Sequence, residues 1–98
     1  MEVRVLRVDR VCTLTIEGRI DTYTAPHLEK VVGENLEDCD KMIFDFTDVE
    51  YISSAGIRVL LYAQREMIKK DGMVVKNVRP KVASLFTITG MPNVLTIE

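Results

Sequence analysis

Apolar and polar residues alternate along the first part of the chain, in the pattern of a β-hairpin. Val3 and Val5 are separated by Arg4, and from residue 12 to residue 16 apolar side chains alternate with threonines. Such a two-residue period is typical of strands with one buried face. Asp9-Arg10, between the two runs, is a polar break that suits a turn. We therefore predict that the chain opens with two antiparallel strands.

A helical spacing replaces the alternation after Thr24. Apolar residues three or four positions apart would form one stripe of a helix, namely Ala25, Leu28, Val32 and Leu36. Thr24 is a residue type that caps helices, and Pro26 is tolerated in a first turn because the N–H groups there have no intrahelical partner. A short strand over residues 41–47 follows, largely covered on both faces, with alternating Met42, Phe44 and Phe46.

The second helix has the clearest pattern, with its stripe formed by Ile57, Leu60, Leu61, Gln64 and Ile68. Lys69 and Lys70 suit the negative end of the helix dipole, and Gly72 suits the left-handed conformation that often ends a helix. We predict two further strands over residues 73–78 and 94–97. A third helix, starting at Arg79-Pro80-Lys81 and ending at Gly90, lies between them.

The predicted order of elements is ββαβαβαβ, which is typical of the α/β class. We expect one domain over residues 1–98, a four- or five-stranded mixed sheet flanked by three or four helices. The loop from Asp48 to Ser54 would connect a strand to the second helix. This loop therefore lies at the carboxyl end of a strand, the edge at which open α/β sheets carry their functional sites.

Length and composition exclude several classes of protein. With 98 residues, 47% of them hydrophobic, the chain can build one core and no second domain, so a catalytic cleft between domains is excluded. A formal net charge of -2 with scattered basic residues argues against a nucleic-acid partner. No apolar run approaches the roughly 18 residues of a membrane span, and the N-terminus lacks the apolar segment of a signal peptide. We expect a cytoplasmic protein.

The two cysteines are far apart in the sequence. Cys12 and Cys39 form no CxxC motif, and His27 is the only histidine that could join them as a zinc ligand. This spacing suggests neither a disulfide framework nor a zinc site. We predict two reduced, buried thiols and no bound metal.

Two serines precede the second helix, and their position allows two interpretations. The free N–H groups of a helix start can be capped by a serine oxygen, or they can stabilise a phosphate on that serine. Ala55 and Gly56 carry no bulky side chain that would shield the hydroxyl of Ser54. Arg58 lies one helical turn further on the same face, as either a phosphate ligand or a solvated charge. These residues alone leave capping and phosphorylation open.

An enzyme is the competing class. Ser54, His27 and an aspartate could form a triad, but the nucleophile elbow needs a small residue two positions before the serine, where this chain has Ile52. The phosphate-loop motif GxxxxGK[ST] is also absent. His27 falls near the start of the first helix, where a surface position is the simpler interpretation. We expect a binding module that is not an enzyme and needs no cofactor.

Three segments together resemble the signature of STAS domains, and especially of the bacterial anti-sigma factor antagonists. Gly18-Arg19-Ile20-Asp21, followed by small polar residues, is similar to the family's G-x-(L/I)-D. Residues 45–61 resemble its central motif, an acidic strand residue, a short loop, Ser54 two positions before Gly56, and an apolar helix. Residues 80–90 resemble the family's P-x-V-x-x-L-(F/L)-x-x-(S/T)-G. The motifs stand in the family's order and cover practically the whole chain.

The resemblance implies a STAS-like fold and a partner switch controlled by phosphorylation of Ser54. The unphosphorylated domain would bind an anti-sigma factor that is also a serine kinase, and so release a sigma factor. Phosphorylation by that kinase would reverse the binding, and a PPM-type serine phosphatase would restore it. Many members of the family have an aspartate where this chain has Ser53. Ser53 is therefore the alternative phosphate acceptor.

The same resemblance implies that the partner docks on the loop edge, on residues Asp21, Thr22, Tyr23, Ser53, Ala55, Gly56 and Arg58. Asp21 also has a purely structural interpretation, in which it ends a strand and caps the next turn. A STAS subunit of a stressosome or of a lipid-transporter complex would carry the same motifs, and this is the alternative function. Alone, the chain is expected to be a monomer.

Overall fold

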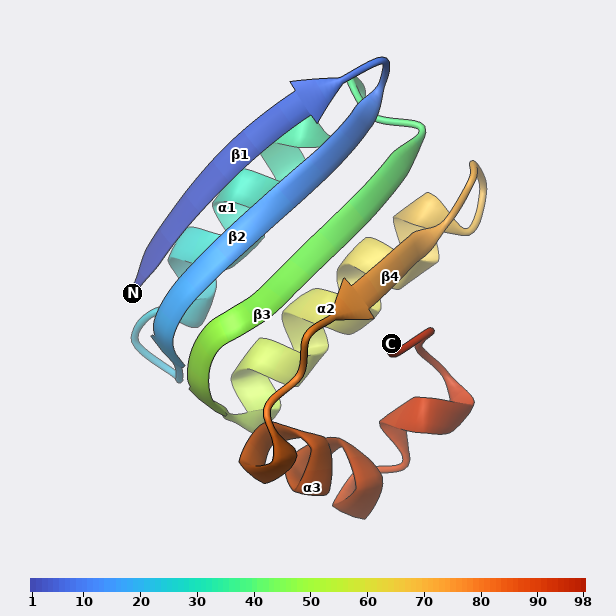
Figure 1. Ribbon diagram of the computed structural model, residues 1–98. Coiled ribbons are helices and arrows are strands. Elements are labelled where there is room, and N and C mark those ends of the chain that lie inside the picture. The colour runs from blue at the N-terminus through green and yellow to red at the C-terminus, as the bar shows by residue number, and fades with distance from the viewer.

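Four strands form one mixed sheet in the order β1-β2-β3-β4, as the computed structural model of residues 1–98 shows (Figure 1). The hairpin strands β1 and β2 are antiparallel, whereas β2, β3 and β4 run parallel. The elements are β1 (Glu2–Val8), β2 (Val11–Ile20), α1 (Ala25–Asn35), β3 (Lys41–Ile52), α2 (Ser54–Met67), β4 (Met73–Lys76), α3 (Pro80–Ile88) and the short 3-10 helix η1 (Met91–Asn93). The predicted α/β class and mixed sheet are confirmed.

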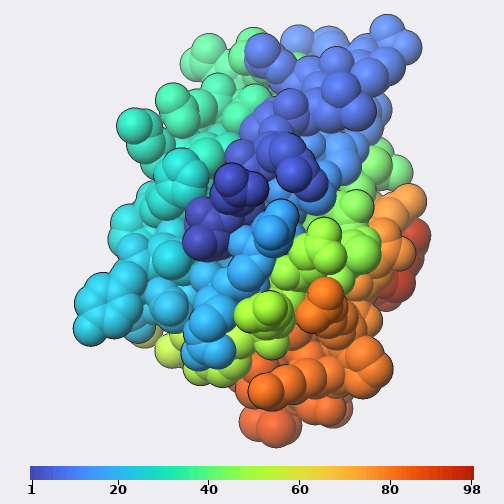
Figure 2. Space-filling model, turned by 60° about the vertical axis from the view of Figure 1, so that its left-hand side comes forward, coloured from blue at the N-terminus to red at the C-terminus, as the bar shows by residue number.

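The opening hairpin is confirmed with a two-residue turn. Val8 pairs with Val11, and the turn residues Asp9 and Arg10 have φ angles of 51° and 64°. Positive φ at both central residues matches the twist of the flanking strands, which is why two-residue hairpins favour it. β1 is the edge of the sheet and is mostly exposed, and Figure 2 shows it in dark blue on the surface.

The core lies between one face of the sheet and the helices α1 and α2, which run behind the strands in Figure 1. Fully buried side chains come from both layers, with Leu14, Phe44 and Phe46 on the strands and Leu28 and Leu60 on the helices. α3 packs at the end of the sheet, where Phe86 meets Phe46 with ring centroids 6.0 Å apart. None of the helices combines the length and the apolar character that a membrane crossing requires.

Strand β3 is longer than predicted. The segment after Thr47 was expected to be a loop, yet it continues as strand to Ile52 and pairs with the second half of β2. The register of that pairing shifts twice along β2. At such irregularities the alternation of buried residues changes phase, so Phe46 and Val49 are both buried although they lie three positions apart. This change of phase hides the strand in the sequence pattern.

The ends of the later helices agree with the sequence, but the final strand does not. Gly72, with φ of 87°, follows α2 and donates its N–H to the Met67 carbonyl, as the left-handed residue after a helix commonly does. Ile68, predicted on the buried stripe, is 67% exposed. Instead of a strand over residues 94–97, η1 follows α3, and one bridge pairs Ile97 with Val75.

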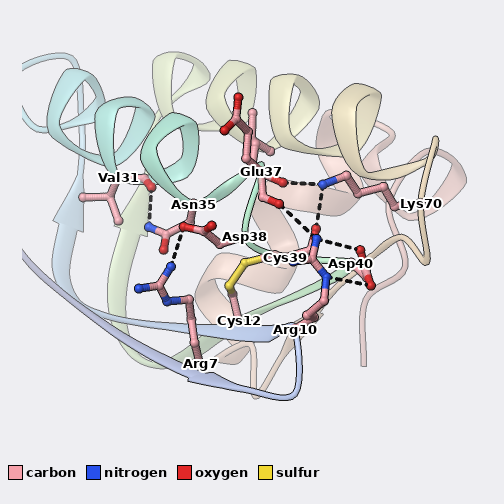
Figure 3. Close-up of a disulfide and its surroundings, with 11 residues drawn as sticks. Arg7, Arg10, Cys12, Val31, Asn35, Glu37, Asp38, Cys39, Asp40 and Lys70 are labelled. Carbon is pink, nitrogen blue, oxygen red and sulfur yellow. Dashed lines mark hydrogen bonds and ion pairs between the residues drawn. A yellow bond between two sulfur atoms is a disulfide. The ribbon is translucent and has the colours of Figure 1, made fainter.

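The prediction of two reduced thiols is wrong, although their burial is confirmed. Cys12 and Cys39 form a disulfide with a Cα–Cα separation of 5.8 Å, inside the usual range, and neither is exposed (Figure 3). Parallel pairing explains the encounter, because it aligns Cys12 with Met42, three residues after Cys39. The segment around Cys39 is held further by the ion pairs Arg7–Asp38 and Arg10–Asp40.

Candidate functional site

The carboxyl ends of β2 and β3 meet at one edge of the sheet and bring two distant segments together. The Ser53 N–H donates to the Ile20 carbonyl at 2.8 Å, which ties the end of β3 to the end of β2. The turn that begins at Asp21 therefore lies beside the start of α2, near the lower end of Figure 1. We call this region, residues 21–24 and 53–58, the switch edge.

Asp21 organises the turn between β2 and α1. Its Oδ1 accepts hydrogen bonds from the N–H groups of Tyr23 at 2.9 Å and Thr24 at 3.0 Å. The hydrogen bond from the Thr24 N–H is the main reason why the pKa of the Asp21 carboxyl lies below its ordinary value. Thr24 precedes α1 as predicted, but its side chain makes no capping bond to the helix. Its hydroxyl accepts from the Asp21 N–H at 2.8 Å and donates to the Arg19 carbonyl.

The boundary of α2 falls between the two serines and gives them different surroundings. Ser53 is the capping residue, with extended backbone and a side-chain oxygen that accepts from the Gly56 N–H at 3.3 Å. Ser54 is the first residue of the helix, its side chain is exposed, and its hydroxyl makes no hydrogen bond in the protein. Because Ser53 does the capping, the hydroxyl of Ser54 is available for another role.

Gly56 has a different role from the predicted one. It was expected to keep access to Ser54 open, but it is buried and faces the sheet. A Cβ atom at this position would lie 2.6 Å from Ile20 Cγ2 and 2.7 Å from Ile52 Cγ1, closer than real Cβ atoms come to such neighbours. The glycine therefore allows the first turn of α2 to pack closely against the ends of β2 and β3.

A hollow of about 220 Å³ opens between the first turns of α1 and α2. It brings together three of the predicted partner-binding residues, Thr22, Ala55 and Arg58. Pro26 and Glu29 of α1 also line it and were missed by the sequence analysis. Pro26 and Glu29 lie outside the apolar stripe of α1, so the sequence pattern predicts that they are exposed. The pattern does not show that α2 lies next to them.

One tyrosine belongs to the switch edge and a second lies beside it. Tyr23, predicted to bind the partner, is 92% exposed at the tip of the turn. Arg19 lies over the ring of its cross-strand neighbour Tyr51, 4.4 Å from the ring centroid, in a cation–π contact that the sequence analysis did not identify.

The structure does not bring a catalytic triad or a metal centre together. His27 is exposed in the first turn of α1, and no hydrogen bond joins its ring to Ser54. No group of three or more histidine, cysteine, aspartate or glutamate side chains is placed to hold a metal ion. What the edge offers is a free serine hydroxyl, an exposed tyrosine and a small hollow lined by Arg58 and Glu29.

Comparison with known proteins identifies the family. The family model described as STAS domain matches residues 2–98, so the chain belongs to the STAS domain family. An anti-sigma-B factor antagonist of Bacillus subtilis (strain 168) is 35% identical over 93 residues, which are 87% of this chain and 79% of that protein.

Solved structures share the fold. The crystal structure of an anti-sigma factor antagonist from Mycobacterium paratuberculosis has a TM-score of 0.89 and 26% identity, covering 98% of this chain and 83% of that one. The anti-sigma factor antagonist SpoIIAA in its unphosphorylated form has a TM-score of 0.84 at 17% identity and covers 99% of this chain and 88% of that one. At this identity the likeness to SpoIIAA shows the fold alone.

Proposed function

We propose that this chain is an anti-sigma factor antagonist whose binding to an anti-sigma factor is switched by phosphorylation of Ser54. The names of its relatives support the class of partner. The choice of Ser54 as the phosphate acceptor rests on one observation at the start of α2. Ser53 caps the helix, whereas Ser54 is exposed and has a free hydroxyl.

The partner in this proposal is a serine kinase as well as an anti-sigma factor. The unphosphorylated chain docks its switch edge on that kinase, and the sigma factor is released. Tyr23, almost fully exposed, offers the type of rigid aromatic side chain that often anchors a protein interface. In this proposal the chain itself is the phosphate acceptor of that kinase and a binding module.

Phosphorylation changes the interface with little effect on the fold. A phosphate adds nearly two negative charges at a helix N-terminus, where the unpaired N–H groups and the helix dipole favour negative charge. The same charges would lie within the docked surface and oppose the contact with the kinase. A PPM-type serine phosphatase would remove the phosphate and restore binding.

Phosphorylation by the cognate kinase with ATP tests the choice of residue. Intact-mass spectrometry should show one added phosphate on the wild-type chain and on Ser53→Ala, and none on Ser54→Ala. Because Ser53→Ala removes the neighbouring hydroxyl, it is the matched control. Full modification of Ser54→Ala would show that the acceptor is another residue.

Binding to the same kinase tests the partner. Calorimetry should show that the wild-type chain binds and that Ser54→Asp, with an unchanged circular dichroism spectrum, does not. A wild-type chain that captures a transporter or stressosome component from cell extract, and not a kinase-like anti-sigma factor, would contradict the proposal and favour the alternative function.

A further inference from the structure

Arg58 stands at a position that connects the hollow with Ser54. It lines the hollow between α1 and α2, and it follows Ser54 by four residues on α2. Side chains four residues apart lie on the same helix face, and a helical side chain leans toward the N-terminus of its helix. The guanidinium of Arg58 can therefore reach either into the hollow or toward the hydroxyl of Ser54.

This guanidinium is exposed and has no partner within the protein. Arg7, Arg10 and Arg79 each form an ion pair with an aspartate, whereas Arg58 takes part in none of the five ion pairs of the structure and in no side-chain hydrogen bond. Glu29 lines the same hollow from α1, but it does not pair with Arg58 either. An arginine fork binds carboxylates and phosphates with two parallel hydrogen bonds, so Arg58 has its full capacity for an anion.

We infer that Arg58 is the residue that senses the phosphate on Ser54, and that in the unphosphorylated chain it binds an acidic side chain of the partner seated in the hollow. This inference rests on the proposed function, because it assigns a recognition role to a residue of the proposed docking surface. Phosphorylation then offers Arg58 a second anion within its own helix, and the partner's carboxylate loses its ligand.

The shape and charge of the hollow support one acidic side chain as the occupant. Its volume of about 220 Å³ suits a single side chain, and Ala25, Pro26 and Ala55 give it walls that can contact an aliphatic stem. Arg58 is the only cationic residue that lines it. Glu29 also lines the hollow and would oppose the incoming carboxylate, so substitution of Glu29 distinguishes an acidic occupant from a basic one.

The contact between Arg58 and the phosphate is tested on the chain alone. Phosphoserine is incorporated genetically at position 54, and the second pKa of its phosphate is measured by phosphorus NMR in the wild type, Arg58→Ala and Arg65→Ala. An ion pair between Arg58 and the phosphate should make that pKa about 0.4 pH unit lower in the wild type than in Arg58→Ala. Arg65→Ala should have the wild-type pKa. Arg65, exposed in the last turn of α2, is the matched control. Equal pKa values in the wild type and Arg58→Ala would overturn the sensor role.

The contact between Arg58 and the partner is tested by calorimetry with the cognate anti-sigma factor. Arg58→Ala should weaken binding of the unphosphorylated chain about tenfold, as a well-placed interface side chain does. Arg65→Ala should stay within about twofold, like most changes to exposed charges. Glu29→Gln should strengthen binding, because it removes a charge that repels the partner's carboxylate. Weaker binding of Glu29→Gln would show a basic occupant and overturn the inference.

The two proposals fail in different ways. If the wild-type chain does not bind the anti-sigma factor, or if phosphorylation leaves binding unchanged, the proposed function is wrong, while the phosphorus NMR experiment still decides whether Arg58 meets the phosphate. If binding is switched by Ser54 but phosphorylation reduces it by the same factor in the wild type and in Arg58→Ala, the proposed function stands and the sensor role is wrong.

Discussion

Two adjacent serines differ in role because a helix boundary falls between them. The Ser53 oxygen is committed to the Gly56 N–H, and the Ser53 N–H is committed to the Ile20 carbonyl. Ser54, one position later, starts the helix and makes no such side-chain contact. A modification of Ser54 therefore leaves the cap and the link to β2 in place, which is what a reversible switch on a stable domain requires.

Asp21 should make the stability of the domain depend on pH. Its pKa in the folded state lies below the ordinary 3.8, chiefly because the Thr24 N–H donates to it. A lowered pKa means that its stabilisation is present above the unfolded-state value and is lost as the pH falls through the folded-state value. In urea unfolding, Asp21→Ala should therefore be less stable than the wild type at neutral pH, and the difference should shrink below about pH 4.

A difference between wild type and Asp21→Ala that stays constant from neutral to acid pH would show that the Asp21 charge has no part in the turn. The carboxyl carbon shift of Asp21, followed by NMR, provides an independent reading of its pKa in the folded chain.

The sequence identifies most residues of the switch edge, but not their individual tasks. Ser54, Asp21 and Arg58 can be found from a hydroxyl at a helix start and from the motifs beside it. The choice of Ser53 as the cap depends on where β3 ends, and β3 ends where its pairing with β2 ends. Glu29 joins the site through the packing of α1 against α2, a contact between segments that no local pattern describes.

The position of α2 depends on close contact between its first turn and the ends of two strands. Gly56 lies against Ile20 of β2 and Ile52 of β3, so these two strand ends determine how near the helix can come. The hydrogen bond from Ser53 to the Ile20 carbonyl fixes the same corner. Since Ser54 and Arg58 are carried by this turn, the packing at Gly56 sets the geometry of the switch edge.

Two alanine substitutions should have opposite effects on the free energy of unfolding. In Gly56→Ala the new methyl group would overlap two isoleucines, and overpacking of this kind costs about 1–3 kcal/mol, more than the helix propensity gained. In Gly33→Ala, inside α1, the methyl group would lie 3.5 Å from the Tyr62 hydroxyl, an ordinary contact. This control should gain up to about 1 kcal/mol from helix propensity. Chemical denaturation measures both changes, and a Gly56→Ala variant as stable as Gly33→Ala would contradict the packing role.

Elements with a regular pattern could be predicted, and irregular ones could not. The hairpin, the three helices and the stop of α2 follow from alternation, helical spacing and Gly72. The second half of β3 escaped prediction because the register shift puts Phe46 and Val49 out of phase. The C-terminal segment makes only one bridge to β4, since the N–H groups of Val94 and Leu95 donate to the Met91 carbonyl of η1 and are not available to a strand.

The switch edge and the Cys12–Cys39 disulfide lie at opposite ends of β2. β2 runs from Val11, beside the disulfide, to Ile20, at the switch edge, a length of about 30 Å for ten residues in strand conformation. α1, with eleven residues about 16 Å long, starts beside the hollow and ends four residues before Cys39. The disulfide was not predictable from spacing, because only the pairing of β2 with β3 brings its two halves together. The end of the sheet that carries it has a structural role.

Reduction of the Cys12–Cys39 disulfide should lower the stability of the domain while leaving the switch edge intact. The two cysteines are 27 residues apart, and the disulfide closes a loop of this size in the unfolded chain. Opening that loop raises the chain entropy of the unfolded state, which should lower the free energy of unfolding by about 3.5 kcal/mol. Thermal unfolding with and without a phosphine reductant measures the effect, and the variant Cys12→Ala/Cys39→Ala, which reductant should not change, is the control.

Below the unfolding transition, phosphorylation of Ser54 should proceed equally in oxidised and reduced chains, since the disulfide lies at the opposite end of β2. A wild-type chain with the same unfolding temperature in both conditions would contradict the stabilising role, and a change in phosphorylation alone would show that the two ends of the sheet are coupled.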